Sequence, residues 1–394
     1  MIQTGLDKEG PALTGEIQDS SLYAKVRGCL YGVAIGDAMG APAEWKMPPE
    51  IRERYGEIVD FVEPWDGPSE IGKGDGRFTD DTHMTRVLGE IYRAEGTHLD
   101  PFRFAERVVP LIADQPRWLA ERGQEMFLVD RLFYPEKWLL MRLRLANADP
   151  RLGGVGNMVN CGAAMYASPV GIVNACDPIN AYREAIEIFS AHQWSYGLEA
   201  AAVMAACVAE AFRPSATVDS VVATALGLAK EGTQRAIEAV AAEARKYDDW
   251  REAIDPLRDA IRPFDGSAED GVRDRGNKTD DWAPSRLRSI EEVPVAIGFL
   301  IVAKGDFEQS IFGAANYGRD NDSIAGMAGG IAGALHGDGV IRPEWIAQIN
   351  GANRVDLDPL VRDLTRLAVT LQQEQLAVAQ ARQKDFATLT QAAS

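Results

Sequence analysis

Cysteine and long apolar runs are scarce in this chain of 394 residues. The four cysteines are scattered and form no CxxC pair, which argues against a disulfide framework or a zinc site and fits reduced thiols in a cytosolic protein. No apolar run reaches the roughly 20 residues that a membrane span needs. Segment 1–20 is polar and acidic, so we expect a flexible leader and no secretory signal. The sequence therefore predicts a soluble, cytoplasmic protein.

Positive charge and strand patterns are also in short supply. The chain has 41 lysines and arginines against 59 aspartates and glutamates, and its formal net charge is −18. This balance argues against a nucleic-acid backbone or an anionic membrane as partner. Runs of alternating apolar residues are almost absent, whereas helical spacing recurs along most of the chain. With 46% hydrophobic residues, the chain can build a large core, and we predict an all-α fold.

One hydroxyl and two adjacent carboxylates, in Thr79-Asp80-Asp81, precede a stretch with helical apolar spacing over residues 84–91. The pattern places Thr79 and Asp80 at a helix N-cap and Asp81 in the first turn. There the helix dipole tolerates negative charge, and the side-chain oxygens project away from the core. Taken alone, a plain N-cap with a spare acid explains this stretch as well as a functional site does.

A second cluster of the same kind lies far down the chain. Asp320, Asp322 and Ser323 precede another apolar helical pattern over residues 324–335. If the two clusters converge, they offer four carboxylates and two hydroxyls, an all-oxygen shell that suits Mg²⁺, Mn²⁺ or Ca²⁺ rather than zinc. Without cations, the carboxylates would repel one another and some would protonate. We therefore predict a metal site.

Glycines recur every four residues at Gly32, Gly36 and Gly40, along one face of a predicted helix. The absence of side chains on this face permits close contact with another helix. Asp37 lies in the same stretch and Glu44 in the loop after it. From the residues alone, Asp37 could be a satisfied buried acid or a site residue, and Glu44 could be plain surface or a site residue.

Three further stretches bear on the site. Segment 46–76 is rich in glycine, proline and acids and reads as an ordered loop, a common position for a lid. Segment 101–148 has helical periodicity, and we expect its aromatic residues to pack in the core. Segment 153–166 has glycines and asparagines that suit close approach of the backbone to a ligand, although turn chemistry explains them too. No strand precedes it, so a dinucleotide fold is not supported.

His192, near an alanine-rich helix, could be structural or functional.

Three motifs in a fixed order carry a resemblance: Gly36-Asp37-Ala38-Met39-Gly40 with Glu44, Thr79-Asp80-Asp81-Thr82, and Gly318-x-Asp320-x-Asp322-Ser323. With this spacing the chain resembles the ADP-ribosylglycohydrolase family, which includes dinitrogenase-reductase-activating glycohydrolase, the ADP-ribosyl-acceptor hydrolases and J1 crystallin. The resemblance runs from about residue 22 to 338. It implies one compact all-α domain, which we expect over 21–345. From the residues themselves we expect an insertion at about 247–284, which is rich in Asp, Arg and Gly, and a C-terminal helical tail over 346–394.

The resemblance also implies a role for individual residues. A binuclear centre of two Mg²⁺, or Mn²⁺, would be held in a cleft by Thr79, Asp80, Asp81, Asp320, Asp322 and Ser323. Glu44 would lie beside the scissile bond. A glycine-rich loop would cradle diphosphate and ribose, and a histidine would lie near the distal ribose. The substrate-binding set expected here is Asp37, Asn157, Asn160, Cys161, Gly162, Ala163, Tyr166 and His192. Cys161 stands where the family commonly has Asn, and Tyr166 where it has Arg, a bidentate phosphate donor.

These parts predict hydrolysis of a ribosyl glycosidic bond. Its oxocarbenium-like transition state is stabilised by carboxylates, and two metals can orient ribose hydroxyls and lower the pKa of a bound water. We assign catalytic roles to Glu44, Asp81 and Asp322, with metal-bound water as nucleophile. The first hypothesis is an ADP-ribosyl hydrolase that acts on a protein side chain or a small acceptor. The second is an N-glycoside hydrolase of a smaller ribosylated metabolite, and the third a non-enzymatic, crystallin-like relative. The sequence leaves the oligomeric state open.

Overall fold

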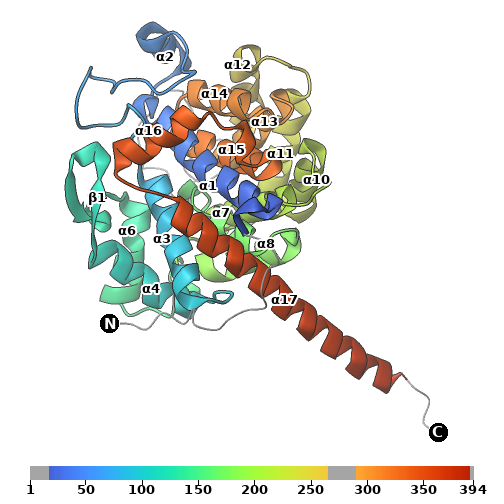
Figure 1. The fold of residues 1–394 in the computed structure, drawn as a ribbon. Coiled ribbons are helices and arrows are strands. Elements are labelled where there is room, and N and C mark those ends of the chain that lie inside the picture. Colours follow the sequence, from blue (N-terminus) through green and yellow to red (C-terminus); the bar gives the residue numbers. More distant parts are fainter. Residues whose placement is uncertain (1–16, 265–289, 391–394) are drawn as a thin grey trace.

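The computed structural model describes residues 17–264 and 290–390, and within these residues the regular secondary structure is helical apart from one small hairpin (Figure 1). This confirms the all-α prediction. The helices are α1 (Ser21–Gly40), α2 (Pro48–Tyr55), α3 (Asp80–Glu95), α4 (Pro101–Ala113), α5 (Leu128–Arg131), α6 (Tyr134–Leu139), α7 (Ser168–Val173), α8 (Pro178–Phe189), α9 (Ser195–Ala211), α10 (Val218–Leu228), α11 (Glu231–Ala244), α12 (Trp250–Ile261), α13 (Glu292–Val302), α14 (Phe307–Tyr317), α15 (Asn321–His336), α16 (Pro343–Asn353) and α17 (Asp358–Leu389).

Helices α1 and α15 pack together at the centre of the molecule, with their backbones in direct contact. A Cβ atom added at Gly36 would lie 2.1 Å from the carbonyl oxygen of Ala325, and one at Gly32 would lie 2.2 Å from that of Gly329. The predicted close contact of the glycine face is therefore confirmed. It extends beyond the predicted stretch to Gly28, and it fixes the position of α15 relative to α1.

Helix α3 follows the predicted pattern. Its apolar face, which includes Met84, Leu88 and Ile91, is fully buried. The helix begins after Thr79, whose backbone is extended, and ends at Gly96, whose φ of 64° is in the left-handed region that glycine adopts without strain. Helix α3 therefore has its acidic start beside the α1–α15 pair and its far end at the surface.

Two predictions of local structure were wrong. Segment 46–76 is not all loop, because α2 forms within it. Pro48 is tolerated in the first turn, and the Glu50 carboxylate accepts a hydrogen bond from the Met47 backbone N–H. Segment 101–148 is not all helical, because β1 (Pro116–Leu119) and β2 (Gln124–Phe127) form an antiparallel hairpin. The turn between them contains Gly123 with φ of 63°.

The prediction that the aromatic residues of segment 101–148 pack in the core was only partly correct. Phe127, Phe133 and Tyr134 keep 41%, 36% and 50% of their surface exposed. Phe133 and Tyr134 instead line a pocket that is described below.

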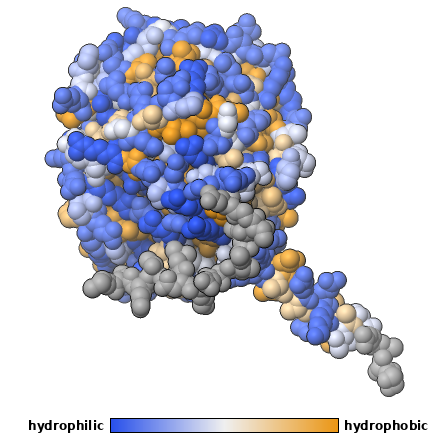
Figure 2. Space-filling model, viewed as in Figure 1, coloured by the Kyte–Doolittle hydropathy of each residue, from blue (hydrophilic) through white to orange (hydrophobic). Residues whose placement is uncertain are grey.

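The C-terminal helix α17 packs on the body along its first part and projects from it along its second (Figure 1). Leu364 and Leu371 are buried, whereas Leu376, Val378 and Phe386 are exposed. Figure 2 shows hydrophobic and hydrophilic residues side by side on the part of the helix that projects from the body. None of the described helices is both long and apolar enough to span a membrane. The predicted leader lies mostly outside the described residues, as does the second half of the predicted insertion, whereas α12 in its first half packs against α11, α13 and α14.

Candidate functional site

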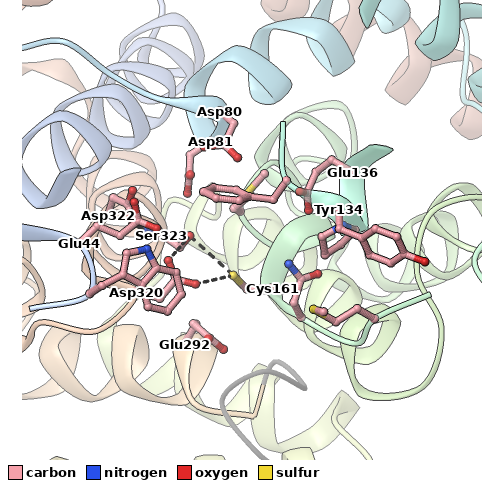
Figure 3. A pocket seen from close by; sticks show the side chains of 16 residues that line it. Glu44, Asp80, Asp81, Tyr134, Glu136, Cys161, Glu292, Asp320, Asp322 and Ser323 are labelled. Carbon is pink, nitrogen blue, oxygen red and sulfur yellow. Dashed lines mark hydrogen bonds between the residues drawn. The ribbon is translucent and has the colours of Figure 1, made fainter. Parts of the chain in front are cut away.

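The starts of α3 and α15 meet at one pocket, with a cavity volume of about 270 Å³ (Figure 3). The two acid clusters, which are 239 positions apart at Asp81 and Asp320, therefore converge as the sequence predicted. The lining residues are Glu44, Trp45, Asp80, Asp81, Phe133, Tyr134, Pro135, Glu136, Met158, Asn160, Cys161, Met165, Glu292, Asp320, Asp322 and Ser323.

Asp37 of α1 holds the start of α3 in place from behind the pocket. Its carboxylate is fully buried and accepts hydrogen bonds from the backbone N–H and hydroxyl of Thr79, at 3.0 and 2.9 Å. It also accepts hydrogen bonds from the backbone N–H and hydroxyl of Thr82, at 3.1 and 2.6 Å. Burial raises the pKa of Asp37, and these hydrogen bonds oppose that shift. Asp37 thus supports the Thr-Asp-Asp turn, and the contact with substrate that we predicted for it stays a prediction.

Neither N-cap residue at the site uses its side chain as a cap. Thr79 precedes α3 and Asp320 precedes α15, yet neither side chain accepts a hydrogen bond from a backbone N–H of its own helix. The Thr79 hydroxyl donates to Asp37, and the Asp320 carboxylate accepts a hydrogen bond from the Ser323 hydroxyl at 3.3 Å. Because N-cap acids ordinarily satisfy backbone N–H groups, the pocket-facing Asp320 carboxylate is available to another partner.

The carboxylate oxygens form two overlapping groups that could each hold a cation. Oxygens of Asp37, Asp81 and Asp322 lie within 4.8 Å of one another, and so do oxygens of Glu44, Asp320 and Asp322. Asp81 Oδ1 is buried and accepts no hydrogen bond from any residue in the described part of the chain. Burial, together with the repulsion from neighbouring carboxylates, raises the pKa of Asp81 and of Asp322. An all-oxygen donor set with an unsatisfied buried oxygen fits a hard divalent cation such as Mg²⁺.

A pair of backbone hydrogen bonds fixes the loop that carries Glu44 against the turn before α15. The Trp45 N–H donates to the Arg319 carbonyl at 2.6 Å, and the Arg319 N–H donates to the Lys46 carbonyl at 2.8 Å. Gly318 makes this approach possible, since a Cβ atom there would lie 2.2 Å from the Lys46 carbonyl oxygen. As a result, Glu44 lies beside Asp320 and Asp322 although it belongs to a different part of the chain.

Two cations that sequence reasoning did not identify pair with the acids. Arg131 is buried and lies 2.6 Å from Asp80 Oδ1, and it also pairs with buried Glu121. Both carboxylates raise the pKa of Arg131 against the opposing effect of burial. Lys73 pairs with Glu44 and lies 3.5 Å from Asp322 Oδ2. No local pattern distinguishes these two residues from the other lysines and arginines of the chain, because their role depends on the convergence of distant segments.

Cys161 lies in the pocket wall next to the α15 cluster. Its thiol donates a hydrogen bond to Asp320 Oδ2 at 3.1 Å and lies 3.6 Å from the Ser323 hydroxyl. Burial, with added repulsion from Asp320, raises the pKa of the Cys161 thiol well above its ordinary value. The residue therefore stays protonated and acts as a donor to a carboxylate.

The remaining residues of the predicted substrate loop differ in their access to the pocket. Asn160 lines the pocket, where its side-chain oxygen accepts hydrogen bonds from the Gly162 N–H and the Gln193 amide. Asn157 is buried and donates to the carbonyls of Pro135 and His192. Ala163 is also fully buried. Asn157 and Ala163 therefore support the loop from inside the fold.

Tyr166 and His192 form a buried pair behind this loop. Both are fully buried, and the Tyr166 hydroxyl lies 2.7 Å from His192 Nδ1. His192 Nε2 lies 3.1 Å from the Pro135 carbonyl, which can only accept, so Nε2 carries the hydrogen and Nδ1 accepts from the tyrosine. Burial lowers the pKa of His192 to about 3. The predicted direct contact of these two side chains with substrate stays a prediction, and their visible role is to order the loop.

Glu136 is a pocket residue that sequence reasoning missed. It lies on α6, is 1% exposed, and extends into the pocket on the side away from Asp320 and Asp322 (Figure 3). Burial and the nearby Asp80 raise its pKa to about 8, and the Asn160 amide and Arg131 lower it. Glu136 lies in a short helix of apolar and charged residues, and no local sequence pattern there predicts that its side chain lines a pocket.

The chain is similar in sequence and in fold to known proteins. The sequence profile of a family described as ADP-ribosylglycohydrolase matches residues 18–375. An uncharacterized protein of Archaeoglobus fulgidus is 30% identical, over 79% of this chain and 87% of its own length. The ADP-ribosylarginine hydrolase Tri1 of Pseudomonas putida is 25% identical, over 82% of this chain and 74% of its own length. A solved structure titled ADP-ribosylglycohydrolase-related protein complex has a similar fold, with a TM-score of 0.58, 18% identity, and coverage of 88% of this chain and 99% of that one.

Proposed function

The chain belongs to the ADP-ribosylglycohydrolase family, and from this premise we propose that it hydrolyses a ribosyl glycosidic bond with the help of two divalent cations, Mg²⁺ or Mn²⁺. Family membership supports an ADP-ribosyl hydrolase activity. The observation that carries the metal proposal is the pair of carboxylate groups that share Asp322. Thr79, Asp80, Asp81, Asp320, Asp322 and Ser323 are the proposed ligands, and Asp37 and Glu44 lie within the same two groups.

The bound cations would orient ribose hydroxyls and make a water molecule more acidic. The protein residues contribute the rest of the chemistry. Glu44 would accept a proton from the attacking water and return it to the leaving group as the bond at C1″ breaks. Asp37 and Arg131 act as positioning residues, since they hold the Thr79 turn and the Asp80 carboxylate in place. Apolar and aromatic residues form part of the pocket wall beside the site that we propose for the oxocarbenium-like transition state.

Two substrate classes compete within this proposal. The first is an ADP-ribosyl group on a protein side chain or a small acceptor, in keeping with the relative named ADP-ribosylarginine hydrolase. The second is a smaller ribosylated metabolite. A cavity of about 270 Å³ favours the second class, because it lies just below the roughly 300–1,000 Å³ of typical ligand pockets. A non-enzymatic, crystallin-like role is the least favoured, because all six proposed metal ligands are present.

The decisive experiment measures metal binding and hydrolysis together. Mn²⁺ binding to the full chain is titrated by calorimetry or electron paramagnetic resonance, with Asp322→Ala as the test variant and Asp255→Ala, an exposed residue of α12, as control. We expect Asp322→Ala to lose metal binding and the release of ribosyl product, because Asp322 belongs to both carboxylate groups. Full metal affinity in Asp322→Ala, or hydrolysis that resists chelation, would refute the proposal.

A further inference from the structure

The last part of α17 is a helical segment that the rest of the described chain leaves uncovered. Every residue from 376 to 389 is exposed, and Figure 1 shows the end of α17 extending away from the body. We name residues 376–389 the projecting segment. The family profile ends at residue 375, so this segment lies beyond the part of the chain that matches the family. A helix of this length is marginal in water when nothing packs against it, and a partner would stabilise it.

The apolar stripe that packs α17 against the body continues along the projecting segment. On the body the stripe includes Leu364 and Leu371, which are buried. Continued in steps of three and four residues, the same helix face reaches Val378 and Leu389, with Phe386 beside them. These three side chains are 69%, 80% and 66% exposed. The projecting segment therefore extends an established packing face into solvent.

The order of residues along this stripe suits a second copy of the same segment. Arg382 and Asp385 lie between Val378 and Leu389 on the same face. In an antiparallel pair, the start of one segment lies opposite the end of the other. When Val378 of one copy is placed opposite Leu389 of the second, the same register places Arg382 opposite Asp385, and two-fold symmetry gives each contact twice. One register thus matches apolar with apolar side chains and cation with anion.

The position of the body selects the antiparallel arrangement. Because the stripe faces the body along the first part of α17, a parallel pair would bring both bodies to one end and into the space between the helices. An antiparallel pair keeps them at opposite ends of a segment about 20 Å long, well beyond the Debye length of roughly 8 Å at physiological ionic strength. The net charge of −18 therefore opposes the parallel pair far more strongly. Asp385 is the one acid of the projecting segment.

We propose that the projecting segment is a self-association surface, through which two copies of this chain form an antiparallel helix pair. The residues that line the pocket all lie outside α17, so each copy keeps its own pocket accessible. This inference goes beyond the proposed function, and it depends neither on bound cations nor on ribosyl chemistry.

The test measures the association of the full chain by sedimentation velocity, with Val378→Asp as the test variant and Ala377→Asp as the matched control. Both substitutions add the same charge at adjacent exposed positions. Ala377 lies about 100° around the helix from Val378, on the side away from the stripe. Concentrations run from about 1 to about 500 µM, because a contact between segments this short belongs to the small and weak class of interfaces. Urea unfolding shows that the body of each variant keeps its fold.

We expect the wild type and Ala377→Asp to dimerise with the same Kd. Val378→Asp should raise this Kd about tenfold or more, because it places an unpaired carboxylate against Leu389 of the second copy. A wild type that stays monomeric over the whole concentration range would overturn the proposal. So would a Val378→Asp protein that associates as tightly as the wild type.

Charge reversal tests the antiparallel register. Arg382→Glu and Asp385→Arg should each raise the Kd about fivefold, since the symmetric dimer contains two such exposed pairs, and the combined variant should restore the wild-type Kd. A parallel pair would place each residue opposite its own copy, so the absence of this rescue would overturn the antiparallel arrangement. Flotation with vesicles of phosphatidylcholine and phosphatidylserine supplies the last measurement. A monomer that binds these vesicles through Val378 would overturn the proposal in favour of a lipid surface.

Discussion

The contact between α1 and α15 yields a stringent prediction, because it leaves no room for one methyl group. A Cβ atom at Gly36 would lie 2.1 Å from the Ala325 carbonyl oxygen and 2.3 Å from its carbonyl carbon, where ordinary contacts begin at 3.4 Å. The helices would have to separate by about 1.3 Å, and a backbone cannot rotate away as a side chain can. Overpacking of a core costs about 1–3 kcal/mol, so we expect Gly36→Ala to lose about 3 kcal/mol of unfolding free energy in urea.

The matched control is Gly227→Ala, near the end of α10, where an added Cβ atom meets nothing within 4 Å. Alanine stabilises a helix by roughly 0.5–1 kcal/mol relative to glycine, so the two identical substitutions should have opposite signs. Because α15 begins at the Asp320–Ser323 cluster, Gly36→Ala should also weaken Mn²⁺ binding, whereas Gly227→Ala should not. A Gly36→Ala protein as stable as the wild type, with unchanged metal affinity, would refute the reasoning.

Two further predictions concern buried charge. Arg131→Met leaves the Asp80 and Glu121 carboxylates buried without their cation, and we expect a loss of about 3–5 kcal/mol in metal-free urea unfolding; a loss below 1 kcal/mol would count against the pairing. The second prediction follows from the raised pKa of Glu136, about 8 against an ordinary 4.5. The folded state then holds a proton that the unfolded state releases, so this residue lowers stability as pH rises between those two values. Glu136→Gln should therefore gain stability over the wild type by about 1.4 kcal/mol per pH unit in that window, and a gain independent of pH would contradict the assignment.

The sequence predicted the parts of the site that carry their own local signal. Thr79-Asp80-Asp81 and Asp320 to Ser323 each combine too many oxygens for a cap with an apolar helical pattern directly behind them, and the structure brings them to one pocket. The close contact of the glycine face of α1 could be predicted in the same way, because glycines repeated every four residues lie on one face of a helix and leave room for another backbone. In each of these cases, the residues that make up the pattern lie within a few positions of one another in the sequence.

The residues that sequence reasoning missed depend on contacts between distant segments. Arg131 and Glu136 lie on neighbouring short helices, and nothing in their local sequence distinguishes one as a paired cation and the other as an acid that lines the pocket. Their roles arise because Asp80 lies beside Arg131 and Gly162 leaves space beside Glu136. Asp37 shows the converse case. A motif identified it as unusual but could not show that the backbone N–H groups and hydroxyls of Thr79 and Thr82 donate hydrogen bonds to its carboxylate.

The balance of charge links the fold to the proposed chemistry. Five aspartates lie close together at the starts of α3 and α15 and on α1 behind them: Asp37, Asp80, Asp81, Asp320 and Asp322. Among the described residues, two cations lie within ion-pair distance of these aspartates, namely Arg131 and Lys73. The glycine-mediated contact between α1 and α15 prevents these acids from moving apart. The repulsion is therefore built into the folded state, and a ligand that binds only that state stabilises it by about 2.7 kcal/mol at a hundred times its Kd. Divalent cations would thus stabilise the same rigid contact that holds their ligands in place.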